Sequence, residues 1–143
     1  MNTDTPIARD NQGVGNAGLF FVCYSLAMRG WNVLPTSRNA KGIDVIVYDR
    51  NGTKFVSIQV KTLSKRSAVP LGERPTCHMA QVVVVCRLSA GKGNPELYFM
   101  KPSEIDACRH QGDPTKSKAE KSAFWLQAKD YENFPDRWDL LDH

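Results

Sequence analysis

Apolar residues recur along the chain with two periods, and each period predicts a type of element. From Asn16 to Gly30 they return every three or four residues, which predicts a helix with Asn16 as N-cap and Gly30 as its stop. Shorter runs with alternating or β-branched composition predict strands at 31–34, on both sides of the turn within 42–62, at 81–88 and at 97–100.

The second half of the chain mixes short elements with polar segments. Residues 63–79, with two prolines and a glycine, predict a long loop, and Ser103 is the expected N-cap of a short helix ending near His110. A lysine-rich loop at 111–122 precedes a strand at 123–127, and the acidic tail around Trp138 is expected to pack on the body. The order of helix, three or four strands, helix and strand predicts an α/β domain.

The most informative segment is GIDVIVYDRNGTKFVSIQVKT at 42–62. Asn51-Gly52 between two apolar runs predicts a hairpin with these two residues as its turn. Opposed residue numbers then sum to 103, which places Asp44 across from Gln59. Strand alternation puts Lys61 on the same face as Gln59, while Val56, Ile58 and Val60 face the core.

Two interpretations of this cluster remain open from the residues alone. Asp44 and Lys61 are compatible with a cross-strand ion pair at a sheet edge, with Gln59 as a neutral neighbour. They are equally compatible with a site that binds a cation and a phosphate.

Composition narrows the class of protein. A chain of 143 residues suits a single domain spanning 1–143, and we expect 1–12 to be a flexible tail. The polar start lacks the apolar core of a secretory signal, and the longest apolar run, 82–86, cannot span a membrane. Cys23 and Cys86 read as buried thiols, and Cys77-His78 lacks a second ligand pair for zinc. We therefore expect a reduced, cytoplasmic protein.

At Gly42-Ile43-Asp44 and Gln59-Val60-Lys61 the chain resembles the PD-(D/E)xK nuclease superfamily, which has a restriction-endonuclease-like fold. A helix ending in Arg29-Gly30-Trp31, a strand and a polar loop precede Asp44 as in that superfamily, and the Q-x-K form is similar to Mrr-like restriction proteins and archaeal-type Holliday junction resolvases. The resemblance covers about 13–62. It implies a three-layer core with a mixed central sheet of about five strands flanked by helices.

The resemblance also implies a catalytic site. Asp44, Gln59 and Lys61 would be the catalytic residues, with Mg²⁺ or Mn²⁺ held by Asp44, the side-chain oxygen of Gln59 and the backbone carbonyl of Val60. Lys61 would orient or help deprotonate the attacking water and offset phosphate charge. The implied activity is metal-dependent hydrolysis of phosphodiester bonds, with DNA as the expected partner.

One position departs from the superfamily pattern. Where many relatives carry a glutamate in the first helix, this chain has Leu19 within Ala17-Gly18-Leu19. Asp44 is then the single anionic ligand expected, with Asn16 as a partial substitute on the helix. An alternative is therefore a catalytically degenerate nuclease-fold module that binds nucleic acid, and a third is a protein-interaction domain.

Basic residues around the hairpin fit contacts to a phosphate backbone. The expected nucleic-acid-binding residues are Arg38, Lys41, Lys65, Arg66 and Arg74. The net charge of +4 permits a polyanionic partner without requiring one. Junction resolvases act as dimers, so the resemblance also allows a homodimer.

Overall fold

A computed structural model describes residues 10–37, 42–72, 79–89, 93–112 and 124–142. Several predicted features lie outside the described residues: Arg38, Lys41, Arg74, Cys77-His78 and most of the loop at 111–122.

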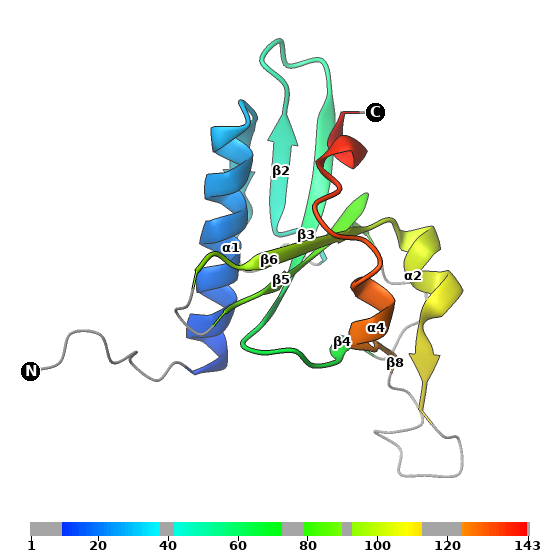
Figure 1. The fold of residues 1–143 in the computed structure, drawn as a ribbon. Helices are drawn as coiled ribbons and strands as arrows, with labels where there is room; N and C mark the ends of the chain where they lie inside the picture. The colour runs from blue at the N-terminus through cyan, green and yellow to red at the C-terminus, as the bar shows by residue number, and fades with distance from the viewer. Residues whose placement is uncertain (1–9, 38–41, 73–78, 90–92, 113–123, 143) are drawn as a thin grey trace, which may run out of the picture.

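The centre of the molecule is a five-stranded sheet (Figure 1). In spatial order its strands are β1 (Asn32–Pro35), β2 (Val45–Tyr48), β3 (Phe55–Leu63), β5 (Val82–Arg87) and β6 (Glu96–Met100). Neighbouring strands are antiparallel except β3 and β5, which run parallel. The sheet is therefore mixed, and the predicted α/β class and strand number are confirmed.

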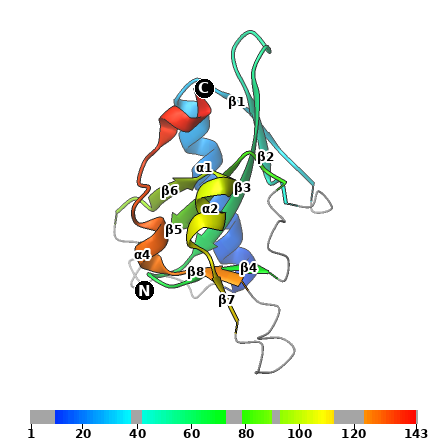
Figure 2. The same ribbon diagram turned by 90° about the vertical axis from the view of Figure 1, so that its right-hand side faces the viewer.

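Layers on both faces of this sheet complete the fold (Figure 2). Helix α1 (Asn11–Met28) and the 3-10 helix η1 (Trp138–Leu141) pack on one face. The other face carries helices α2 (Pro102–Cys108) and α4 (Ala128–Tyr131) and a small sheet of β4 (Val69–Gly72), β8 (Phe124–Leu126) and β7 (His110–Gln111). Each face has its own apolar cluster, so the expected three-layer core is present.

The first helix starts earlier than the sequence pattern predicted. Its N-cap is Asp10, whose carboxylate accepts a hydrogen bond from the Gly13 N–H at 2.7 Å, and Asn16 is an exposed residue within the helix. The predicted tail at 1–12 was therefore wrong for residues 10–12. Gly13 and Gly15 weaken the helical pattern, but the cap satisfies an orphan N–H of the first turn and extends the helix. The predicted stop at Gly30, with φ of +93°, is confirmed.

Two further boundaries differ from prediction. The segment 63–79 was predicted to be a loop, but it contains the strand β4. Pro70 is tolerated in this strand because β4 is an edge strand that pairs on one side only, with β8. Helix α2 is capped at Lys101, whose N–H donates to the Glu104 carboxylate at 2.8 Å, so Ser103 lies inside the helix and is not its cap.

The predicted packing of the tail is confirmed. The Trp138 ring lies 4.7 Å from the Phe99 ring, centroid to centroid, and the Arg29 guanidinium lies 4.0 Å over it. The strand predicted at 123–127 is observed as β8. Cys23, Cys86 and Cys108 are free thiols, and burial raises the pKa of Cys86 to about 12.

Helix α1 lies directly against β3 at Gly18. A Cβ atom added to Gly18 would be 1.9 Å from Thr62 Oγ1 and 2.7 Å from Thr62 Cβ. Val22 and Leu26 of the same helix are fully buried, and Leu19 packs against the same apolar cluster. The helix is thus set close to the strand that carries Gln59 and Lys61. Within the described ranges, no helix has the length and apolar content needed to cross a bilayer.

Candidate functional site

The β2–β3 hairpin has the predicted register and a longer turn than predicted. Tyr48 pairs with Phe55 and Ile46 with Ser57, so opposed numbers sum to 103. The loop spans 49–54 and is not a two-residue turn, since the Asp49 N–H donates to the Lys54 carbonyl at 3.1 Å. The Asp49 carboxylate also accepts hydrogen bonds from the Thr53 hydroxyl and from the N–H groups of Lys54 and Thr53. These bonds stabilise the wider turn and lower the pKa of Asp49. An even number of loop residues leaves the register unchanged.

Asp44 lies one residue beyond the last strand pair, Val45 with Ile58. Its N–H donates to the Ile58 carbonyl at 2.9 Å, and its carboxylate Oδ2 accepts from the Val60 N–H at 2.7 Å. The carboxylate therefore occupies the edge of β3 where β2 has ended. It touches the backbone between Gln59 and Lys61.

Thr36 fixes the other side of Asp44. The Thr36 N–H donates to the Asp44 carbonyl at 2.9 Å, and the Thr36 hydroxyl donates to the Ile43 carbonyl at 2.5 Å. Sequence reasoning placed Thr36 in a polar loop and missed this role. The contact arises because β1 pairs with β2 and Thr36 directly follows β1, a pairing that local sequence patterns do not report.

Gln59 and Lys61 lie on the face of the sheet opposite α1. The even-numbered residues of β3 pack toward α1, with Val56 and Ile58 buried, whereas Leu63 belongs to the cluster on the other face. Both side chains are half-buried, as is Asp44. Among the described residues, neither Gln59 nor Lys61 has a side-chain hydrogen bond or ion pair.

On this face of the sheet, Gln59 and Lys61 lie between a part covered by other elements and a part exposed to solvent. Gln59 and Lys61 pair with Val83 and Val85, which α4, β4 and β8 help to bury. On the other side, no described helix or strand covers this face of β1 and β2, where Leu34 is 50% and Phe55 57% exposed. Figure 2 shows the hairpin tip extending away from α4 and β8. An extended ligand could therefore approach over β1 and β2 and reach Lys61.

The Asp44 carboxylate is the charged oxygen ligand that this site offers a metal ion. Within the described residues, no group of three or more His, Cys, Asp or Glu side chains is arranged to hold a metal ion. The oxygen donors at this point are the Asp44 carboxylate, the Gln59 amide and peptide carbonyls. Such donors suit a hard cation such as Mg²⁺, and the low negative charge predicts weak affinity.

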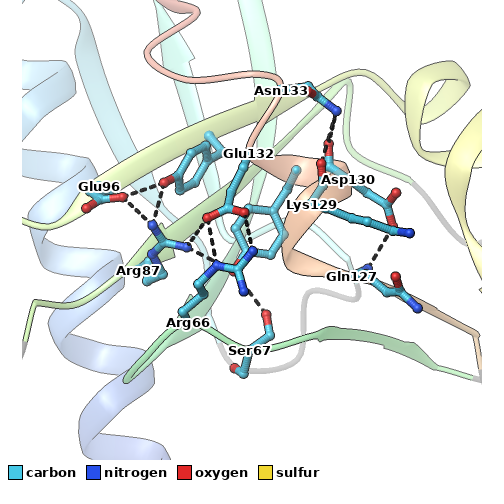
Figure 3. A network of polar contacts seen from close by, with 11 residues as sticks. Arg66, Ser67, Arg87, Glu96, Gln127, Lys129, Asp130, Glu132 and Asn133 are labelled. Atoms are coloured by element: carbon cyan, nitrogen blue, oxygen red, sulfur yellow. Dashed lines mark hydrogen bonds and ion pairs between the residues drawn. The ribbon is translucent and has the colours of Figure 1, made fainter.

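Of the basic residues predicted to contact phosphates, Lys65 and Arg66 are described, and both are exposed. Arg66 is bound to Glu132, with its Nε 3.0 Å and its Nη2 2.7 Å from the two carboxylate oxygens (Figure 3). Lys65 has no ion pair to a described residue. Of these two neighbouring cations, Arg66 is thus engaged by a described carboxylate and Lys65 is not.

Glu132 is the centre of a network that sequence reasoning missed. It also accepts a hydrogen bond from Arg87 at 2.9 Å, and Arg87 reaches Glu96 at 2.5 Å (Figure 3). The Tyr131 hydroxyl donates to the Ser67 carbonyl at 3.0 Å. Together these contacts tie the segment after β3 to α4. Hydrogen bonds from Arg66, and then from Arg87, lower the pKa of Glu132 to about 2.

Comparisons with known proteins identify the fold. No protein-family model matches the chain, and no curated protein matches it by sequence. Among solved structures, the chain is similar to a bacterial homing endonuclease, I-Ssp6803I, with a TM-score of 0.57, covering 93% of this chain and 91% of that one. The sequence identity is 14%, so the likeness is one of architecture. The chain has a nuclease-like fold.

Proposed function

We propose that this nuclease-like fold serves a PD-(D/E)xK nuclease that hydrolyses phosphodiester bonds in DNA with a divalent metal ion. The observation that carries the proposal is the 2.7 Å hydrogen bond from the Val60 N–H to the Asp44 carboxylate. It holds the acid of one strand against the Gln59-Val60-Lys61 stretch of the next. A simple ion pair between Asp44 and Lys61, the other interpretation of these residues, is not observed between them.

A Mg²⁺ or Mn²⁺ ion fits the chemistry of the donors. Asp44 Oδ2 is occupied by the Val60 N–H, which leaves Oδ1 as a ligand, and the Gln59 amide oxygen and Val60 carbonyl would complete the protein's share. When bound, such an ion acidifies a water molecule and stabilises charge developing on the phosphate. The charges of Asp44 and Lys61 cancel, so the protein side of the site has no net negative charge to attract a cation. We therefore expect the phosphates of a bound nucleic acid to supply negative charge and strengthen metal binding.

Lys61 is the residue proposed to act on the water and the phosphate. It is half-buried beside Val85 and has no competing carboxylate partner among the described residues. Its ammonium group can therefore orient the attacking water and offset phosphate charge.

The substrate is proposed to approach over the open half of the sheet face. Lys65 follows the strand that carries Lys61 and would supply a cation for the phosphate backbone of the nucleic acid. At the hairpin, the rings of Tyr48 and Phe55 stack with their centroids 5.5 Å apart. Arg38, Lys41, Arg66 and Arg74 remain proposed contacts.

One site cuts one strand, so a homodimer would be needed to cut both strands of a duplex at once. A reduced cytoplasmic setting accords with the free thiols.

A degenerate binding module is the second candidate, and one observation favours it. In the described part of the chain, Asp44 belongs to no group of three or more His, Cys, Asp or Glu side chains placed to hold a metal ion. Such a module would bind nucleic acid in a salt-dependent way and would be indifferent to EDTA.

A cleavage assay separates the two candidates. Purified protein is incubated with linear, branched and single-stranded DNA and with RNA, in millimolar Mn²⁺ or in EDTA. Cleavage of at least one substrate in Mn²⁺ and of none in EDTA is expected of the nuclease. Intact substrates in every arm, with binding retained, would establish the module instead.

A further inference from the structure

The outer face of helix α1 carries a row of large apolar side chains. Phe20, Tyr24 and Met28 recur every fourth residue and are 65%, 62% and 70% exposed. They account for half of the large hydrophobic residues that are exposed in the described part of the chain. We call Phe20, Tyr24 and Met28 the α1 ridge.

The rest of the helix surface carries no charged side chain. The 18 residues of α1 include no Asp, Glu, Lys or Arg, so every exposed position on the helix is neutral. A helix that covers a core on one side normally shows charged residues on the other. Here the inner face is sealed by Val22 and Leu26, both fully buried, and the outer face is apolar from Phe20 to Met28, with the neutral polar residues Gln12 and Asn16 exposed in the turns before it. This second half of the helix has the composition of one covered on two sides.

From this composition and spacing we infer that the α1 ridge is an interface between two copies of this chain. Residues four apart form the ridges that interdigitate in the commonest class of helix pair, and a two-fold axis brings the same ridge of both copies together. With the axis near Tyr24, Phe20 of one copy lies beside Met28 of the other. The small side chain of the exposed Ala27, next to Met28, leaves room for the partner's side chains.

The choice of a second copy follows from charge and area. Helix α1 offers no charge to complement a nucleic acid or a charged partner, whereas two neutral helix faces meet without repulsion or desolvated charge. The three side chains expose roughly 400 Å², about half of the roughly 800 Å² that one partner contributes to a standard interface. The ridge is thus large enough to form the apolar centre of a stable dimer. This inference does not depend on the proposed nuclease activity.

Sedimentation or light scattering of the full chain tests the inference. At about 100 µM the wild type is expected at about 32 kDa, twice the 16.0 kDa of one chain. The double variant Phe20→Glu/Tyr24→Glu is expected at the monomer mass with an unchanged circular-dichroism spectrum. The matched control, Leu34→Glu/Phe55→Glu, alters two residues of similar exposure on the other face of the sheet and is expected to remain a dimer.

A second measurement keeps the inference testable if the glutamate variant fails to fold. Photocrosslinking benzoylphenylalanine replaces Tyr24, and peptide mapping identifies the partner segment. Crosslinks from position 24 to α1 of a second copy support the interface. A monomeric wild type, a control variant that dissociates while the α1 variant does not, or crosslinks to other segments only would each overturn it.

Discussion

The Asp44 carboxylate and the Val60 N–H are joined by a hydrogen bond of 2.7 Å, made just where β2 ends beside β3. The acid is held by backbone contacts on three sides, through Ile58, Val60 and Thr36. These contacts come from the sheet, so they set the position of the carboxylate before any cation binds.

Replacing Gln59 by glutamate should strengthen metal binding. The change adds a second carboxylate next to Asp44, and affinity for hard cations rises with the number of charged oxygen ligands. We expect the Mn²⁺ concentration for half-maximal cleavage to fall roughly tenfold or more. The double variant Gln59→Glu/Asp44→Asn should lose the gain, and an unchanged Mn²⁺ requirement in the single variant would argue against Gln59 as a ligand.

Lys65 and Arg66 should contribute differently to binding. Arg66 is engaged with Glu132, whereas Lys65 is exposed and has no ion-pair partner among the described residues. Lys65→Ala should reduce the slope of log affinity against log salt by about 1, as expected for one lost phosphate contact. Arg66→Ala should change that slope less and lower the urea midpoint more. Fluorescence anisotropy with labelled DNA in EDTA, over a salt series, measures the slopes, and equal slopes for both variants would contradict the distinction.

Gly18 should be required for the packing of α1 on β3. Gly18→Ala places a methyl group 1.9 Å from Thr62 Oγ1, and overpacking of this kind destabilises by about 1–3 kcal/mol. Gly15→Ala in the same helix meets nothing within 4 Å and should stabilise by about 0.5–1 kcal/mol. Urea denaturation of the two variants measures both free energies of unfolding. A neutral or stabilising Gly18→Ala would show that the two elements are less closely packed than described.

The network around Glu132 should make stability depend on acid pH. The pKa of Glu132 is lowered from 4.5 to about 2 in the folded protein, so the native state binds the proton less readily than the unfolded state. The contribution to stability is present above pH 4.5 and is lost as pH falls toward about 2. Wild type and Glu132→Gln should therefore differ in urea midpoint at pH 6, and the gap should close between pH 4.5 and about 2. If the difference in urea midpoint between the two proteins stays constant with pH, the ionisation of Glu132 does not contribute to stability.

Local patterns were enough to predict the hairpin and its register. Alternation in 42–62 set which residues share a face, and the register survived an error in the turn because the loop still has an even number of residues. The start of α1 and the cap of α2 were missed because capping depends on single side chains, Asp10 and Glu104, that periodicity does not report.

Contacts between distant segments were beyond local reasoning. Strand β4 exists through its pairing with β8, and Arg66 is engaged by Glu132, 66 residues later in the chain. The sequence alone therefore presented Lys65 and Arg66 as equivalent cations. It also gave no way to see that Thr36 and Val60 hold Asp44 from two sides.

The most direct test of the central claim compares cleavage by the wild type with cleavage by Asp44→Asn in Mn²⁺. Asparagine keeps an oxygen that can accept the Val60 N–H and removes the charge that a metal ion needs, so the fold and DNA binding in EDTA should be unchanged. We expect the wild type to cut DNA and the variant to lose at least about a hundredfold in rate, in line with loss of a group that stabilises transition-state charge. Equal cleavage by both proteins, or cleavage that persists in EDTA, would contradict a metal site at Asp44.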